Sequence, residues 1–97
     1  MIDLLSVKIQ DGTVTRHNIV KELQFEFKVA ENLRLEVVDA KDFEYALDAY
    51  CYQLKRMSTI VDFLKTVGLL TEKSAEKISK EIDKMYSWRE EIKEHDS

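Results

Sequence analysis

The chain has 97 residues, of which 44% are hydrophobic and 35% are charged. This length indicates one domain over residues 1–97, and this share of apolar residues excludes intrinsic disorder. The net charge of −4 is spread evenly along the chain, which argues against a broad nucleic-acid-binding surface.

The sequence also predicts a compartment. The single cysteine, Cys51, excludes an intrachain disulfide and fits a reducing environment. The N-terminus lacks the basic start and the apolar run of a signal peptide. No apolar run is long enough to span a bilayer. We therefore expect a cytoplasmic protein that makes no contact with a membrane.

Residues 1–38 alternate between apolar and polar positions with the period of a β-strand. The alternation is present in three stretches, at residues 5–9, 23–29 and 33–37. Asp11-Gly12 has the composition of a tight hairpin turn, because both residues tolerate positive φ. The sequence therefore predicts an antiparallel sheet of three or four strands. The fourth strand depends on residues 13–20, where the alternation is interrupted.

Two long helices are expected next, over residues 39–67 and 71–94. Asp39 and Thr71 are suitable N-caps, and Gly68 suits the left-handed conformation that often ends a helix. Apolar residues recur at helical spacing, as Phe43, Leu47, Tyr50, Leu54, Met57, Val61 and Leu64 in the first helix and as Ala75, Ile78, Ile82, Met85 and Ile92 in the second. The prediction is an α+β fold in which a long antiparallel two-helix hairpin packs on the sheet.

No set of residues for catalysis or metal binding is evident. The two glycines do not form a phosphate-binding loop, and both fit turns or helix ends. His17 and His95 have no cysteine or histidine neighbours at the spacing of metal ligands. Cys51 is interpreted as a buried, unreactive thiol. We therefore expect no enzyme, no cofactor and no metal site.

The aromatic residues are more informative about function. Tyr45 and Tyr52 lie seven residues apart and share one face of the first helix, away from its packing seam. They either cover the sheet or face solvent as contact residues, a role in which tyrosine is enriched. Tyr86 and Trp88 lie two residues apart and cannot face the same neighbour, so one of them is available to a partner.

A further apolar stripe, formed by Ile60, Phe63 and Val67, is more than a two-helix seam needs. The candidate partner-binding residues are Tyr45, Tyr52, Ile60, Phe63, Tyr86 and Trp88. This surplus predicts a small non-enzymatic protein–protein interaction module. It would be an inhibitor or adaptor that docks on a larger protein, as bacterial and phage proteins of this size often do, anti-CRISPR proteins among them.

Two alternative functions use the same chain differently. A nucleic-acid-binding accessory protein would need a local basic patch, for which the candidates are Lys28, Arg34, Lys55 and Arg56. A structural subunit of a homo-oligomer, such as a homodimer, would bury the surplus apolar surface against copies of itself.

Overall fold

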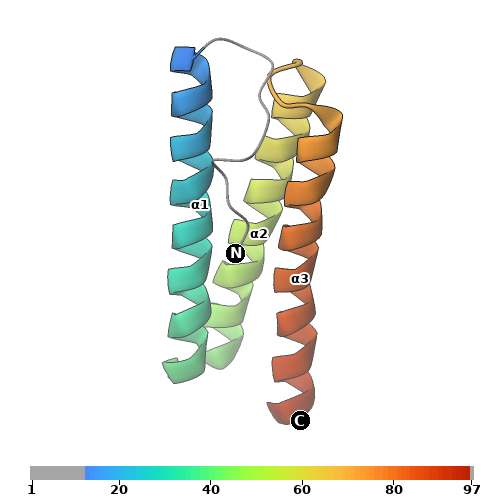
Figure 1. The fold of residues 1–97 in the computed structure, drawn as a ribbon. Coiled ribbons are helices and arrows are strands. Elements are labelled where there is room, and N and C mark those ends of the chain that lie inside the picture. Colours follow the sequence, from blue (N-terminus) through green and yellow to red (C-terminus); the bar gives the residue numbers. More distant parts are fainter. Residues whose placement is uncertain (1–12, 97) are drawn as a thin grey trace.

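The computed structural model describes residues 13–96 and the side chains of residues 17–88. These residues form three helices, α1 (Thr13–Asp39), α2 (Phe43–Thr66) and α3 (Glu72–Asp96), as Figure 1 shows. The described part of the chain contains no β-strand. The molecule is elongated, with extents of 47 × 20 × 19 Å.

The predicted α+β fold is therefore wrong, because α1 occupies 27 residues where strands were expected. Leu23 and Phe27 fit both patterns, since they are apolar in the alternation and lie one turn apart on a helix. The other positions decide between the two patterns. Ala30 and Glu26 are buried, whereas Phe25 is 59% exposed. A buried glutamate at a packing position thus hides the helical period in the sequence.

Of the other parts of the predicted sheet, some are helical and some lie outside the described residues. Residues 13–20 are helical, and so are residues 30–32, where the predicted sheet requires a turn between the strands at 23–29 and 33–37. The turn prediction fails because this stretch contains no glycine or proline and includes Ala30 and Glu31, which favour helices. The expected strand at residues 5–9 and the hairpin turn after it lie outside the described residues.

The connection between α1 and α2 is short, and the helix start is displaced from the predicted one. Asp42 rather than Asp39 is the N-cap of α2, since its Oδ1 accepts a hydrogen bond from the backbone N–H of Tyr45 at 3.1 Å. Asp39 is instead the last residue of α1. The predicted first helix therefore begins too early, because the preceding residues belong to another helix.

The connection between α2 and α3 follows the predicted signals. Gly68 has a φ of 80°, the left-handed conformation expected of it. The backbone N–H groups of Leu69 and Leu70 both donate to the carbonyl oxygen of Leu64. Thr71 caps α3, because its Oγ1 accepts a hydrogen bond from the backbone N–H of Ser74 at 3.2 Å.

Replacing Gly68 with alanine should lower the free energy of unfolding by about 1 kcal/mol, since a Cβ disfavours positive φ. No atom lies within 4 Å of the Cβ that the substitution adds, so the cost comes from the backbone conformation alone. Urea unfolding followed by circular dichroism measures it. Gly68→Asn is the matched control, because asparagine tolerates this conformation better. Equal losses for both variants would contradict the argument.

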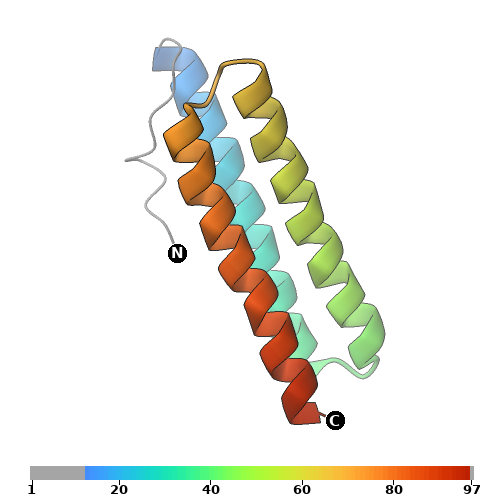
Figure 2. The same cartoon turned by 90° about the vertical axis from the view of Figure 1, so that its right-hand side faces the viewer.

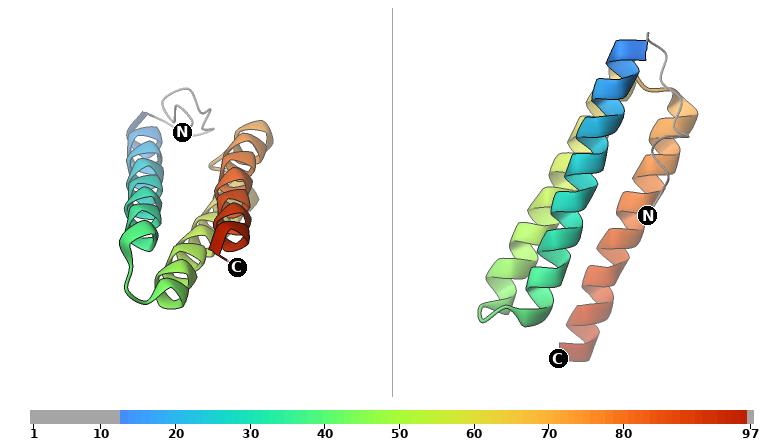
Figure 3. Two further views of the ribbon diagram at one scale, coloured as in Figure 1. Left: turned by 90° about the horizontal axis from the view of Figure 1, so that it is seen from below. Right: turned by 60° about the vertical axis from the view of Figure 1, so that its left-hand side comes forward.

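Helix α2 packs against both other helices, and it runs antiparallel to α3 (Figures 1 and 2). The two outer helices stand apart when the bundle is seen from below (Figure 3), and no Cα atoms of α1 and α3 come within 8 Å. The core is built around the predicted seam of α2, whose buried members are Leu47, Tyr50, Leu54, Met57 and Val61.

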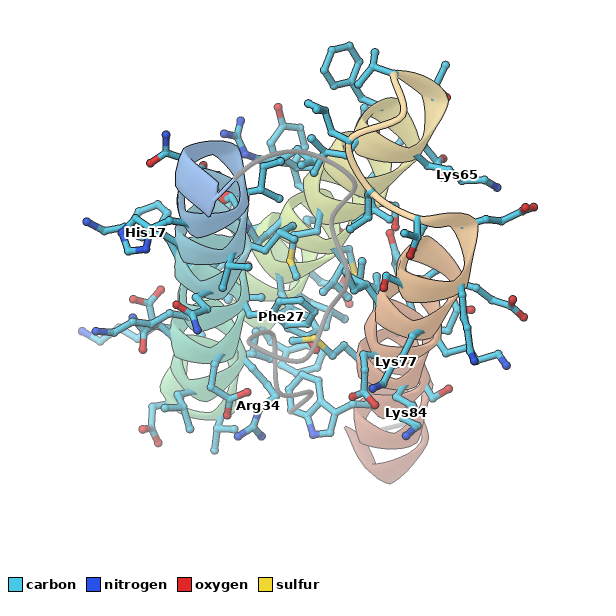
Figure 4. All side chains as sticks on the ribbon, turned by 45° about the horizontal axis from the view of Figure 1, so that its top comes forward. His17, Phe27, Arg34, Lys65, Lys77 and Lys84 are labelled. Atoms are coloured by element: carbon cyan, nitrogen blue, oxygen red, sulfur yellow. The ribbon has the colours of Figure 1, made fainter. Side chains whose placement is uncertain are left out.

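The side chains of the bundle divide clearly between interior and surface (Figure 4). Phe27 points from α1 toward the other helices, whereas His17 and Lys65 point away from them. On α3, Ala75, Ile78 and Ile82 are buried as predicted. None of the three helices, over the residues described, is both long enough and apolar enough to cross a membrane.

Candidate functional site

The outer side of α2 carries a row of exposed apolar side chains. Tyr45, Tyr52 and Phe63 are 74%, 72% and 62% exposed. They belong to one helical stripe, which we call the α2 stripe and which consists of Tyr45, Ala49, Tyr52, Arg56, Ile60, Phe63 and Val67. The interpretation of Tyr45 and Tyr52 as covers for a sheet is wrong, since both side chains face solvent.

Helix α1 widens this stripe into a face. Glu36 of α1 lines a hollow together with Tyr45 and Ala49 of α2. Phe25 lies about three helical turns before Glu36 and therefore points to the same side of α1. Val29 lies between them along this side. We call the α2 stripe together with Phe25, Val29 and Glu36 the outer face.

The centre of the outer face is an ion pair that spans α1 and α2. The Nε of Arg56 donates to Oε1 of Glu26 at 2.6 Å. The Glu26 side chain is 3% exposed, whereas that of Arg56 is 55% exposed. The hydrogen bond to Glu26 raises the pKa of the Arg56 guanidinium. The buried carboxylate thus neutralises Arg56 and fixes one edge of its guanidinium.

Gln53 completes the hydrogen bonding of the buried glutamate. Its Nε2 donates to Oε2 of Glu26 at 3.2 Å and to the backbone carbonyl oxygen of Glu26 at 3.1 Å. Both residues are buried. A buried charge is tolerated only when its oxygens are paired, so Gln53 and Arg56 together account for the position of Glu26.

Replacing Gln53 with alanine should therefore lower the free energy of unfolding by about 1–3 kcal/mol, because two acceptors of Glu26 lose their donor. Chemical denaturation at neutral pH measures this loss. Gln24→Ala on the exposed side of α1 serves as the control and should change stability by less than about 0.5 kcal/mol. If the two variants were equally stable, the hydrogen bonds of Gln53 would contribute nothing.

One open hollow of about 400 Å³ brings together residues from two predicted sets. It is lined by Tyr52, Lys55, Arg56, Thr59 and Ile60. Tyr52 and Ile60 are partner-binding candidates, whereas Lys55 and Arg56 were nucleic-acid candidates. The other two basic candidates lie elsewhere. Lys28 is exposed on α1, and Arg34 lines a separate cavity.

That separate cavity has a volume of about 320 Å³ and is bounded by all three helices, with α1 and α3 on either side and α2 at its base. It is lined by Phe27, Glu31, Arg34, Tyr50, Glu81, Lys84, Met85 and Trp88. The Trp88 ring meets Tyr50 edge-on, with ring centroids 5.3 Å apart. The guanidinium of Arg34 lies 5.5 Å from the centre of the Trp88 ring and also pairs with Glu31. These contacts fix Trp88 within the bundle.

The candidate aromatic residues thus divide into two groups. Tyr45, Tyr52 and Phe63 are exposed on the outer face, and Ile60 lies half-buried beside them. Tyr86 and Trp88 are half-buried against the core of the bundle and do not belong to the outer face. Sequence reasoning missed Phe25, because the alternation around it predicted a strand. Its spacing to Val29 and Glu36 places it on the outer face only once α1 is known to be a helix.

Over the described residues, no group of three histidine, cysteine, aspartate or glutamate side chains is arranged to hold a metal ion. Comparison with known proteins found no matching family model, no matching curated protein and no matching solved structure.

Proposed function

We propose that this chain is a non-enzymatic protein-interaction module that docks on another protein through its outer face. The role of such a small, rigid module would be that of an inhibitor or adaptor of a larger protein. A cytoplasmic location is part of this proposal. The observation that carries it is the row of Tyr45, Tyr52 and Phe63, three large aromatic side chains that are more than half exposed on one stripe.

Three large aromatic side chains exposed on one stripe of a single helix are typical of a binding surface. Tyrosine and phenylalanine are enriched in interfaces because they bury a large area with few rotatable bonds. Singly scattered apolar residues need no explanation, but a contiguous apolar patch usually marks a binding surface. On the outer face, Phe25 and Val67 are exposed as well and add two apolar side chains to the three aromatic ones.

The charges favour a protein partner over a nucleic acid. Arg56 and Arg34 are each engaged by a carboxylate, from Glu26 and Glu31 respectively. A phosphate backbone is recognised by several basic side chains that act together. Here Lys55 is adjacent to an already neutralised arginine, and the remaining basic candidates lie on other surfaces. The net charge of −4 over the whole chain also disfavours binding to a nucleic acid.

Photo-crosslinking in the native host tests this proposal. A photoreactive phenylalanine analogue at position 52 or 63 should yield an adduct with one larger protein, whereas the same analogue at Lys80 of α3 should not. The captured protein, once purified, should bind the wild-type chain at least tenfold more tightly than Tyr52→Ala or Phe63→Ala, a difference of about 1.4 kcal/mol.

Matched controls exclude a folding defect. Both alanine variants replace exposed side chains, so in dilute solution, where the chain is monomeric, their stability should remain within about 0.5 kcal/mol of the wild type. Lys80→Ala, on the exposed side of α3, should bind as tightly as the wild type. If the analogue at position 80 captured the larger protein as efficiently as the analogue at position 52 or 63, the outer face would not be the binding surface.

A further inference from the structure

We infer that the outer face also pairs with the outer face of a second copy of this chain, in an antiparallel dimer centred on Arg56. This inference rests on the proposed function and names one occupant of the same surface. Four observations support it: the spacing of the α2 stripe, the level of Phe25, the charge at the centre and the size of the face.

The α2 stripe reads the same in both directions. Its successive members are separated by four, three, four, four, three and four residues, with Arg56 in the middle. When two copies of α2 run antiparallel with Arg56 at the same level, every stripe residue therefore faces another stripe residue. The resulting pairs are Tyr45 with Val67, Ala49 with Phe63, and Tyr52 with Ile60.

These pairs are complementary in size. The large ring of Phe63 faces the small side chain of Ala49 in the second copy, and Tyr52 faces the smaller Ile60. Alternating large and small residues across a helix interface allows the two surfaces to interdigitate without voids. The symmetry repeats each pair twice, which is the property of an isologous interface.

Helix α1 fits the same symmetry. The hydrogen bond from Arg56 to Glu26 places Phe25, the neighbour of Glu26, at the level of the dimer centre. A two-fold axis across the helices there sets α1 beside α1 of the second copy and brings the two Phe25 rings together. Aromatic pairs of this kind add to the stabilisation from burial alone.

The centre of the interface carries no net charge. Arg56 is paired with Glu26, and the carboxylate of Glu22 lies close enough to raise the pKa of the Arg56 guanidinium further. Together with Lys55, the cluster has two positive and two negative groups. Two copies can therefore approach without the repulsion that bare cations on the axis would cause.

The outer face also has the size that a stable dimer needs. Helix α2 has 24 residues and is about 36 Å long. The bundle is 20 Å wide, so the face covers roughly 700 Å² in each copy. Stable interfaces bury about 600–1,000 Å² per partner, a range that includes this area. Because the dimer and a larger partner use the same residues, they would compete for the outer face.

Light scattering and site-specific crosslinking test the inference. The 11.4 kDa chain should run as a dimer at high concentration and dissociate on dilution, and Tyr52→Ala should weaken the dimer at least tenfold. In a Cys51→Ser background, a short bismaleimide should link a mixture of Tyr45→Cys and Val67→Cys chains. Neither variant should be linked on its own, because the antiparallel arrangement separates like positions.

The outcomes are distinct. A chain that stays monomeric at high concentration overturns the inference, and so does a dimer in which Tyr45→Cys crosslinks to itself. A dimer linked instead through Lys80→Cys on α3 would likewise overturn it. If a monomeric chain still captures a larger protein through positions 52 and 63, the inference fails and the proposed function stands.

Discussion

Replacing Leu54 with alanine is expected to lower the free energy of unfolding by about 2–5 kcal/mol. Leu54 is fully buried in α2, the helix that packs against both other helices. The truncated side chain leaves a cavity that rigid neighbouring helices fill only in part, so the loss exceeds the transfer free energy of the removed atoms. In a domain this small, that is a large share of the total stability.

Urea denaturation monitored by circular dichroism measures the effect of Leu54→Ala. The matched control is Tyr52→Ala, which removes a larger side chain from the same helix but from the exposed outer face. At a dilution where the chain is monomeric, its stability should change by less than about 0.5 kcal/mol. If the two variants unfolded at the same urea concentration, α2 would not bury the side that carries Leu54.

The two helices of the second half could be predicted because their signals are local. Gly68 and Thr71 act through their own backbone and their immediate neighbours, and both do so as expected. The seam of α2 contains only apolar residues, so a helical period is visible in a short window. No information about distant residues was needed.

Helix α1 could not be predicted in the same way, because its packing depends on a distant residue. Glu26 is buried only since Arg56, thirty residues further along, and Gln53 pair with it. In a local pattern the glutamate counts as polar. Phe25 and Leu35, which are exposed, count as core residues in the same pattern. Both misassignments, of a buried residue as exposed and of exposed residues as buried, make the segment look like a strand with alternating faces.

The candidate site was predictable in part. Helical spacing alone places Tyr45 and Tyr52 on one face, and Phe63 on the same stripe. Their exposure could not be derived from spacing, because it depends on which neighbour covers that face. With a helix in place of a sheet, α1 packs beside this stripe and does not cover it, so the aromatic residues remain accessible and Phe25 joins them.

The stability of the protein should also fall at high pH through a single buried tyrosine. Tyr50 is fully buried, and its hydroxyl donates to the backbone carbonyl oxygen of Met85 at 3.1 Å. Burial raises the pKa of Tyr50 to about 12, although the nearby Arg34 guanidinium opposes the shift. The folded state therefore binds the phenol proton more tightly than the unfolded state, whose tyrosines have a pKa of about 10.

The sign of the effect follows from this difference. The stabilisation from Tyr50 is complete below pH 10, and it is lost as the pH rises from about 10 to about 12. A shift of two pKa units corresponds to at most about 2.7 kcal/mol. Urea unfolding at a series of pH values measures the loss, and the absorbance of tyrosinate locates the titration.

Tyr50→Phe separates this contribution from every other group that titrates at high pH. The variant loses the hydrogen bond to Met85, so it is less stable at neutral pH, but it lacks the proton linkage. The difference in stability between wild type and variant should therefore shrink as the pH approaches 12. A difference that stays constant with pH would mean that the Tyr50 hydroxyl is accessible to water. In that case α2 and α3 would pack less tightly at Trp88 than the edge-on contact between the Tyr50 and Trp88 rings requires.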